Sequence, residues 1–466
     1  MSFLKSVTLY IVTTILVSSG VYNAYSTPSY SVKSGPTSIA VPLFANDSVL
    51  VNLNQLKGAI LKAKAGTVFI IKNGVYSNLK YLTLVSNSHN FSIRAETPGG
   101  VIIQGNSSLS IRGCENIQIS GFLFKETTSS NCLVISNSKN IRVYNNVFKS
   151  CGSDRFGALI RLEQGAQGND INHNTFDNNR SMGVVIALSK ENDKKNINNS
   201  IDFNSFKNIP SVASVYPGKD GNGLEAIQLG QGIYGHDWEL NTKIHDNIFE
   251  NIIGDGSEII SVKSSKNEIY NNTFLNNKSG ITLRIGDNSK IYNNYLENTT
   301  QGIRVFGYGH VIKDNYINGS ISAIQLPATH LKHNDVMTKS GYYQQENVTI
   351  TDNTIVNPSL EAFSIGEFAS VKNNRTLMPK NSSISSNKII ITNTKSSAFK
   401  TIGDTVMKHM NVLNNNIVAS KKNRKNLQLV GLMKSNRYNN PVANDNTIPK
   451  NITKYTSNDA RLGARW

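Results

Sequence analysis

A six-residue pattern, Ile/Val-x-x-Asn-x-Phe/Ile/Leu, recurs along most of this chain and limits its possible folds more than any other feature. The clear copies are VYNNVF, INHNTF, IDFNSF, IHDNIF, IYNNTF, IYNNYL, IKDNYI and ITDNTI, which end at Phe148, Phe176, Phe206, Phe249, Phe274, Leu296, Ile317 and Ile355. Weaker relatives end at Phe124, Ile389, Ile417 and Ile448, and the shortest spacings are 21 to 25 residues. Such a period is typical of a solenoid, in which stacked coils bury what a single coil cannot.

Within each copy, apolar residues alternate with polar ones and many are β-branched, which predicts strands rather than helices. The recurring Asn tolerates left-handed turns, and stacked Asn amides can hydrogen-bond from coil to coil. The dense Leu spacing of leucine-rich repeats is absent. The repeat therefore predicts an all-β chain folded as a parallel β-helix.

The segments outside the copies predict the domain plan. Residues 52–61 have helical apolar spacing and precede a strand-like run at 67–71, so we expect a helix that caps the N-terminal end of the solenoid. The gaps at 207–243 and 318–349 are too long for a bare coil, and either wall a cleft or form surface loops. We expect one β-helix domain over residues 27–449 and a loosely attached, basic C-terminal tail over residues 450–466.

Residues 1–26 have the pattern of an export signal. Lys5 precedes an apolar run from Val7 to about Val21, and the small residues of Ala24-Tyr25-Ser26 suit a cleavage site. The run is near the lower length limit for crossing a membrane, so a retained anchor is the alternative. We expect a secreted or periplasmic protein without a stable membrane anchor.

The formal charge of +17 predicts polyanionic partners: nucleic acid, anionic membrane or acidic glycan. No Arg-rich run or aromatic nucleic-acid motif stands out, so we expect an acidic polysaccharide and no nucleic acid. Cys114, Cys132 and Cys151 are spaced by nearly one repeat, so they could lie close in space. Three cysteines allow one disulfide and one free thiol, or no disulfide.

Two cations occupy equivalent positions in neighbouring repeats. Lys263 in EIISVKSS and Arg284 in GITLRIG are 21 residues apart, which should place them on adjacent strands about 4.8 Å apart. Like charges that close cost stability, so the pair is either a functional site or two solvated turn residues. The next block, GIRVFGYGH, adds Arg304 and His310.

The blocks NGLEAIQLG, EIISVKSSKNEIYNNTF, GITLRIG and GIRVFGYGHVIKDNY, in this order, resemble polysaccharide lyase family six, which includes alginate lyases and chondroitinase B. The resemblance covers roughly residues 50 to 320 and implies a right-handed parallel β-helix that cleaves an acidic polysaccharide by β-elimination. It implies that Lys263 removes the C5 proton of a uronate, and that Arg284 protonates or stabilises the leaving oxygen. Arg304, His310 and Glu225 would contact the substrate.

The resemblance also implies a calcium ion, bound by Asn222 and Glu258, that neutralises the substrate carboxylate and so makes the C5 proton easier to remove. The family's Glu-x-Glu pair reads Gly256-Ser257-Glu258 here, so one acidic ligand is missing. Asp255 is the candidate replacement, and a lysine or a water in place of the ion is the alternative. Ile285 also stands where the family has a His after the catalytic Arg.

Alternatives stay open at this point. The GIRVFG block favours alginate as the substrate, and the positive charge leaves a dermatan-type sulfated glycan open. A pectinase-type hydrolase needs paired carboxylates, for which Asp255 and Glu258 are the candidates. A non-catalytic glycan-binding β-helix would explain the missing acid and His. The oligomeric state is not predicted.

Overall fold

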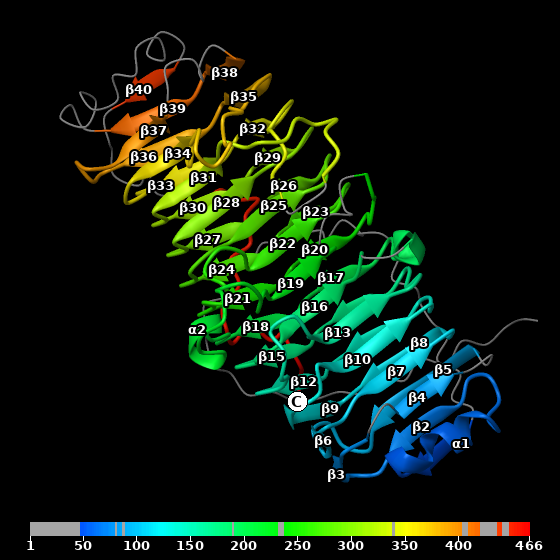
Figure 1. Cartoon of the computed structure of the whole chain (residues 1–466). Helices are drawn as coiled ribbons and strands as arrows, with labels where there is room; N and C mark the ends of the chain where they lie inside the picture. Colours follow the sequence, from blue (N-terminus) through cyan, green and yellow to red (C-terminus); the bar gives the residue numbers. More distant parts are fainter. Residues whose placement is uncertain are drawn as a thin grey trace, which may run out of the picture. The chain divides into compact units, whose positions relative to one another are not determined.

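The computed structural model describes residues 47–79, 82–85, 89–188, 191–231, 237–337, 341–402, 409–419, 436–439 and 447–466 (Figure 1). The predicted export signal lies outside the described residues, as does most of the last repeat copy, which ends at Ile448. Residues 44–466 form one compact unit. The helices in the described ranges are all too short to span a bilayer.

Successive strands go in turn to three parallel sheets, here named A, B and C. Sheet A contains β1 (Ser48–Val51), β2 (Val68–Ile71), β5 (His89–Ala95), β8 (Glu115–Ser120), β11 (Arg142–Tyr144), β14 (Asp170–Asn172), β17 (Ser200–Asp202), β20 (Lys243–His245), β23 (Glu268–Tyr270), β26 (Lys290–Tyr292), β29 (Val311–Lys313), β32 (Thr349–Thr351), β35 (Ser382–Ser385) and β38 (Met410–Leu413). Sheet B contains β3 (Gly74–Ser77), β6 (Val101–Gly105), β9 (Phe122–Thr127), β12 (Val147–Lys149), β15 (Thr175–Asp177), β18 (Ser205–Lys207), β21 (Ile248–Glu250), β24 (Thr273–Leu275), β27 (Tyr295–Glu297), β30 (Tyr316–Asn318), β33 (Thr354–Val356), β36 (Lys388–Ile391), β39 (Asn416–Ala419) and β40 (Arg437–Asn439). Sheet C contains β4 (Leu82–Val85), β7 (Leu109–Arg112), β10 (Asn131–Ser136), β13 (Ala158–Glu163), β16 (Met182–Ile186), β19 (Ile227–Leu229), β22 (Ile260–Lys263), β25 (Ile281–Ile285), β28 (Gln301–Val305), β31 (Ser322–Leu326), β34 (Glu361–Ile365) and β37 (Ser397–Thr401).

Each strand pairs with the equivalent strands of the coils before and after it, so the strands stack along the unit in Figure 1. In the coil of β23, β24 and β25, for example, the partners are β26, β27 and β28 of the next coil. This is a right-handed parallel β-helix, and the fold prediction is confirmed.

The recurring Asn forms a ladder between sheets A and B. In a typical rung, the Asn272 amide donates to the Asn294 side-chain oxygen at 3.0 Å and to the Ile244 carbonyl at 2.9 Å. The ladder runs through Asn146, Asn174, Asn204, Asn247, Asn272, Asn294, Asn315, Asn353, Asn387, Asn415 and Asn436. The left-handed φ falls on the preceding residue, such as Asn271, so the ladder Asn supplies hydrogen bonds to buried backbone rather than the turn conformation.

The last residue of each repeat copy fills the core of sheet B. Phe124, Phe148, Phe176, Phe206, Phe249 and Phe274 are buried and stack with centroid spacings of 4.6, 5.0, 4.5, 5.0 and 4.6 Å. Stacked rings at this distance combine burial with ring–ring attraction. The thiols of Cys114, Cys132 and Cys151 are buried, and the three cysteines form no disulfide with one another.

At the N-terminal end, η1 (Leu53–Gln55) and α1 (Leu56–Ile60) form the predicted helix. Leu53, Leu56 and Ile60 are buried in the core beside the first coils. The predicted strand at 67–71 is β2. Two further short helices, η2 (Glu191–Lys195) and α2 (Val212–Val215), lie in the connections after β16 and β18.

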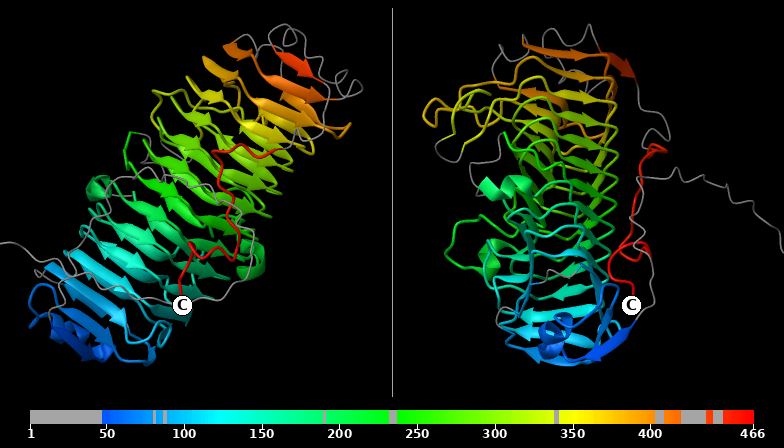
Figure 2. Two further views of the ribbon diagram at one scale, coloured as in Figure 1. Left: turned by 180° about the vertical axis from the view of Figure 1, so that it is seen from behind. Right: turned by 90° about the vertical axis from the view of Figure 1, so that its right-hand side faces the viewer.

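The C-terminal tail is attached firmly, which corrects the expectation of a loose one. It runs back along the outside of the coils (Figure 2). Ile452 packs with Tyr295 and Tyr316, and Tyr455 and Leu462 pack with Ile248, all on the outer face of sheet B. The Tyr455 hydroxyl donates to Asp246 at 2.6 Å. The apolar anchors are separated by polar residues, so the composition of the tail conceals them.

Candidate active site

The outer face of sheet C carries the predicted catalytic residues. Ile260 and Val262 of β22 point into the core, so Ser261 and Lys263 point outward. Val262 of β22 pairs with Leu283 of β25, and the next residue, Lys263, pairs with Ile285. Arg284 has no partner in this register and is the extra residue of a β-bulge. Lys263 and Arg284 therefore come from adjacent strands, as predicted, but the bulge places Arg284 out of register with Lys263.

A buried carboxylate holds two guanidinium groups on this face. Glu258, whose side chain is 1% exposed, accepts from Arg284 Nη1 at 3.3 Å and from Arg304 Nη2 at 3.0 Å through the same oxygen, Oε1. Its other oxygen, Oε2, accepts a short hydrogen bond from Ser261 Oγ. Arg304 comes from β28, opposite Thr282 of β25, so three successive coils build the cluster.

The charges in the cluster keep Glu258 ionised. Burial alone would raise the pKa of Glu258, but the positive charges of Arg284, Arg304 and Lys263 outweigh burial and lower that pKa. An ionised anchor holds the two guanidiniums with charge-assisted hydrogen bonds. The outer face of sheet C thus presents a compact cationic group that is suited to an anionic substrate.

Glu225 lies beneath this group rather than on its surface. It precedes β19, is 1% exposed, and its Oε2 has no hydrogen-bond partner in the described ranges. Burial, together with the carboxylates of Asp255 and Glu258, raises the pKa of Glu225 to about 7 against the opposing charge of Lys263. The expected contact of Glu225 with substrate does not fit this burial.

His310 is also placed differently from the expectation. It is 1% exposed, its Nδ1 accepts from the Ser289 backbone amide at 3.1 Å, and its Nε2 lies 2.9 Å from the Phe306 carbonyl. Burial lowers the pKa of His310 to about 4, so the ring is neutral and holds two backbone segments together. The expected contact of His310 with substrate does not fit this placement, because both ring nitrogens are occupied inside the fold.

Two of the candidate metal ligands, Asp255 and Asn222, already make hydrogen bonds within the protein. Asp255 accepts from Ser257 N at 2.7 Å, Ser257 Oγ at 2.9 Å and Glu258 N at 2.8 Å, so its carboxylate closes its own turn. Asn222 is exposed, and its backbone carbonyl accepts from Arg155 at 3.1 Å. In the described ranges, no three His, Cys, Asp or Glu side chains are grouped closely enough to hold a metal ion.

The long segment between β31 and β32 adds a residue that the sequence did not single out. Tyr343 and Met337 of this segment are buried against Ile285. This contact brings the neighbouring Tyr342 ring to 5.5 Å from the Arg284 guanidinium carbon. The sequence left two interpretations of the gap at residues 318–349, a cleft wall or a surface loop. The structure supports the wall, which packs on Ile285 through Met337 and Tyr343.

A second residue that the sequence missed comes from the connection between β34 and β35. The Arg375 guanidinium carbon lies 4.6 Å from the centre of the Tyr342 ring. Tyr342 therefore contacts two cations, since aromatic faces attract guanidinium groups. In the sequence, Tyr342 stands out only as part of the pair Tyr342-Tyr343 inside the gap at 318–349. Nothing in the sequence marks Arg375 as a site residue.

Comparison with known proteins agrees with this site. The family model described as chondroitinase B matches residues 50–458. The chain belongs to the chondroitinase B family. It is therefore a polysaccharide lyase of family six. No curated protein matches it.

Solved structures show the same fold as this lyase. A mannuronic acid specific polysaccharide family 6 lyase from human gut microbiota is 23% identical, with a TM-score of 0.70 over 85% of this chain and 92% of that one. A mutant of the family 6 alginate lyase AlyGC is 21% identical, with a TM-score of 0.72 over 90% of this chain and 58% of that one. The family 6 lyase Pedsa3628 from Pseudopedobacter saltans is 21% identical, with a TM-score of 0.69 over 90% of this chain and 99% of that one.

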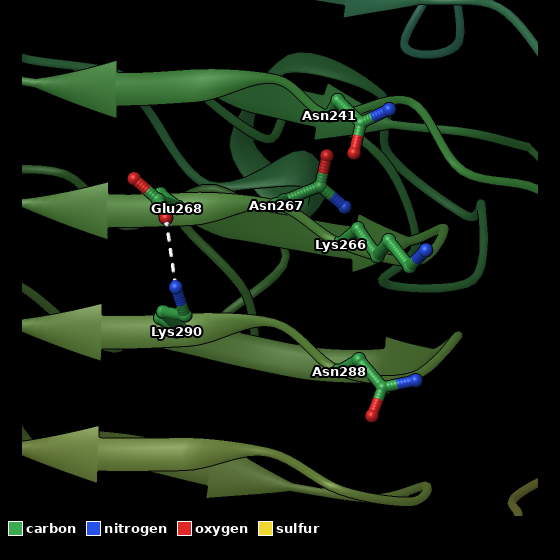
Figure 3. A pocket seen from close by; sticks show the side chains of 6 residues that line it. All are labelled: Asn241, Lys266, Asn267, Glu268, Asn288 and Lys290. Carbon is green, nitrogen blue, oxygen red and sulfur yellow. Dashed lines mark hydrogen bonds and ion pairs between the residues drawn. The ribbon is translucent and has the colours of Figure 1, made fainter.

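A pocket of this lyase, of about 280 Å³, lies at the turns that enter sheet A, and its lining does not include the residues of the cluster. Figure 3 shows its lining residues, Asn241, Lys266, Asn267, Glu268, Asn288 and Lys290. Lys290 pairs with Glu268 at 3.2 Å and Lys266 pairs with Glu239 at 2.7 Å. Each of the two lysines of the pocket has its own carboxylate partner, whereas Arg284 and Arg304 share one, so the pocket offers less to a polyanion than the face of sheet C does.

Proposed function

We propose that this lyase cleaves alginate by β-elimination on the outer face of sheet C. The observation that carries the proposal is the grouping of Lys263 with Arg284 and Arg304 around the ionised Glu258. Several structures of the same fold are described as alginate lyases, including one in complex with a trisaccharide. The net charge of +17 favours binding of a polyuronate.

The reaction assigns one task to each group. The amine nitrogen of Lys263 takes the C5 proton of the uronate, the C5 electron pair forms the C4–C5 double bond, and the bond from C4 to the glycosidic oxygen breaks. Arg284 stabilises the negative charge that develops on that oxygen. A guanidinium is a poor proton donor, because its pKa exceeds about 12. The hydroxyl of Tyr342, whose ring lies 5.5 Å from the Arg284 guanidinium carbon, is our candidate donor to the leaving oxygen.

A hydrolytic reaction fits the same residues poorly. Hydrolysis needs two carboxylates that flank the scissile bond. Glu258 is occupied by two arginines and Asp255 by its own turn. Elimination by a lysine base therefore remains the better proposal.

The decisive experiment measures ultraviolet absorbance of the unsaturated product on alginate and, in parallel, on dermatan sulfate. We expect a rise on alginate, and we expect Lys263→Ala and Arg284→Ala each to lower the rate by roughly 100-fold or more, as removal of an acid–base group does. Full activity in either variant would disprove the assignment. A rise on dermatan sulfate alone would move the substrate to the sulfated glycans, and a folded protein inactive on both would favour a glycan-binding role.

We also propose that the protein is exported, on the pattern of residues 1–26. N-terminal sequencing of the mature protein from the culture medium or periplasm tests this proposal. We expect the chain to begin close after Ser26, and an intact N-terminus on a membrane-bound protein would contradict cleavage.

A further inference from the structure

The residues around Glu258 bear on how this lyase neutralises the carboxylate of its substrate. A calcium ion takes six to eight oxygen ligands, usually including several carboxylate oxygens that point at one centre. The position two residues before Glu258, where the family resemblance places a second acidic ligand, is Gly256. Gly256 has a φ of 76°, a conformation that favours glycine over any residue with a side chain.

Glu258 itself has little capacity left for a metal. One carboxylate oxygen accepts from both Arg284 and Arg304, and the other accepts from Ser261. A divalent cation at Glu258 would lie next to two fixed guanidinium charges, which repel it. The remaining candidates do not compensate, because Asp255 closes its own turn and Asn222 is exposed on its loop.

The arginines that exclude a metal carry the charge that a metal would supply. Glu258 balances only one of the two guanidiniums, so the group of three keeps a net positive charge. A guanidinium has five N–H donors, and each arginine spends one of them on Glu258. The side chains of Arg284 and Arg304 are 17% and 14% exposed, so both reach the surface of sheet C.

We propose that Arg304, held by Glu258, binds and neutralises the substrate carboxylate, and that this lyase therefore works without calcium. The role of Arg304 rests on the proposed elimination reaction, whereas the absence of a calcium site at Glu258 does not. The bidentate geometry that guanidinium groups make with carboxylates suits this task. Arg284 stays free for the leaving oxygen.

The first test is calcium binding, which needs no substrate. Isothermal titration of the chelator-treated protein with calcium chloride should show no stoichiometric binding at micromolar to low millimolar calcium. Thermal unfolding should give the same Tm with calcium and with EDTA. Saturable binding of one ion that Glu258→Gln removes would overturn the proposal.

The second test is activity. Rates on alginate in EDTA and in calcium should agree within about twofold, and Arg304→Ala should lower kcat/KM by roughly 100-fold or more in both, as loss of an oriented charge contact does. Arg142→Ala, which removes an exposed cation of sheet A, should leave the rate unchanged. Loss of the wild-type rate in EDTA, or a fully active Arg304→Ala, would overturn the proposal.

If Arg304→Ala does not fold, Arg304→Lys replaces it. A lysine keeps the charge but not the planar fork, so a rate equal to wild type would overturn the role of Arg304. If no polymer is cleaved under either condition, the proposed reaction fails, and the titration still decides the metal question.

Discussion

At the scale of single residues, the site depends on Glu258 more than on either arginine alone. A buried carboxylate with two guanidinium partners sets the direction of both side chains. Removing one partner of a buried charge group leaves the others uncompensated and costs several kcal/mol. The side chain of Glu258 cannot reach a substrate directly, because it is 1% exposed. Glu258 is therefore a positioning residue in the proposed reaction, in which Lys263, Arg284 and Arg304 form the surface that meets the polymer.

Tyr342→Phe tests the proton donor at this scale. We expect kcat on alginate to fall roughly 10- to 100-fold with KM little changed, because the ring keeps its contact with Arg284 while the hydroxyl is lost. Steady-state absorbance of the unsaturated product measures both constants. The control is Tyr292→Phe on β26, a tyrosine of sheet A that should keep full activity. An unchanged kcat in Tyr342→Phe would assign the proton transfer to water.

The residue scale is also where the sequence was least able to predict the site. The order and spacing of Lys263, Arg284 and Arg304 came from the repeat, and the structure brings the three together. The repeat could not show that the ring of His310 points inward, because a turn residue can face either side. Tyr342 lies in an insertion without a period, so only the packing of Tyr343 on Ile285 locates it.

At the scale of elements, the Asn ladder and the Phe stack explain why so short a repeat specifies a fold. Every copy adds one amide to the ladder and one apolar side chain to the core of sheet B. Both could be predicted from sequence, because each depends only on the residue type and the period. The β-bulge at Arg284 could not, since it depends on the register between two particular strands.

Asn272→Ala tests the ladder. The Asn272 side chain donates to Ile244 and Asn294 and accepts from Asn247, all in the buried interior. We expect a loss of about 2–4 kcal/mol in the free energy of unfolding, because several buried polar groups lose their partners at once. Denaturant titration followed by circular dichroism measures it. Lys290→Ala, which breaks an exposed ion pair on the neighbouring coil, should cost less than about 1 kcal/mol.

The carboxyl group of Asp202 on sheet A gives a prediction for how the stability of the protein depends on pH. Burial, together with the charge of Asp170 on the neighbouring strand, raises the pKa of Asp202 to about 7 against the opposing charge of His245. A carboxyl group with a raised folded-state pKa binds more protons when folded, so its contribution to stability falls as pH rises from about 4 to 7. Asp202→Asn should remove that fall and raise Tm at pH 8 relative to wild type by about 1–2 °C. If the Tm difference between Asp202→Asn and wild type were the same at pH 5 and at pH 8, the raised pKa assigned to Asp202 would be contradicted.

At the scale of the whole compact unit, the C-terminal tail joins coils that are far apart in sequence. Asn451 bonds to Asn293, Tyr455 to Asp246, and the Trp466 indole to the Asn145 carbonyl. The tail thus covers apolar side chains on the outer face of sheet B that would otherwise be exposed. Sequence composition could not predict this strap, because only three well-separated apolar residues anchor it.

Truncation before Lys450 tests the strap. Removing Ile452, Tyr455 and Leu462 should destabilise the protein by roughly 3 kcal/mol or more, since each buries an apolar side chain against the coils. The rate on alginate below the transition should stay close to wild type, because the tail lies on sheet B and the cationic group lies on sheet C. Thermal unfolding and the absorbance assay together separate the two effects. A truncated protein with an unchanged Tm would show that the tail contacts do not stabilise the fold, and one that keeps its Tm but loses activity would place the tail in the function of the site.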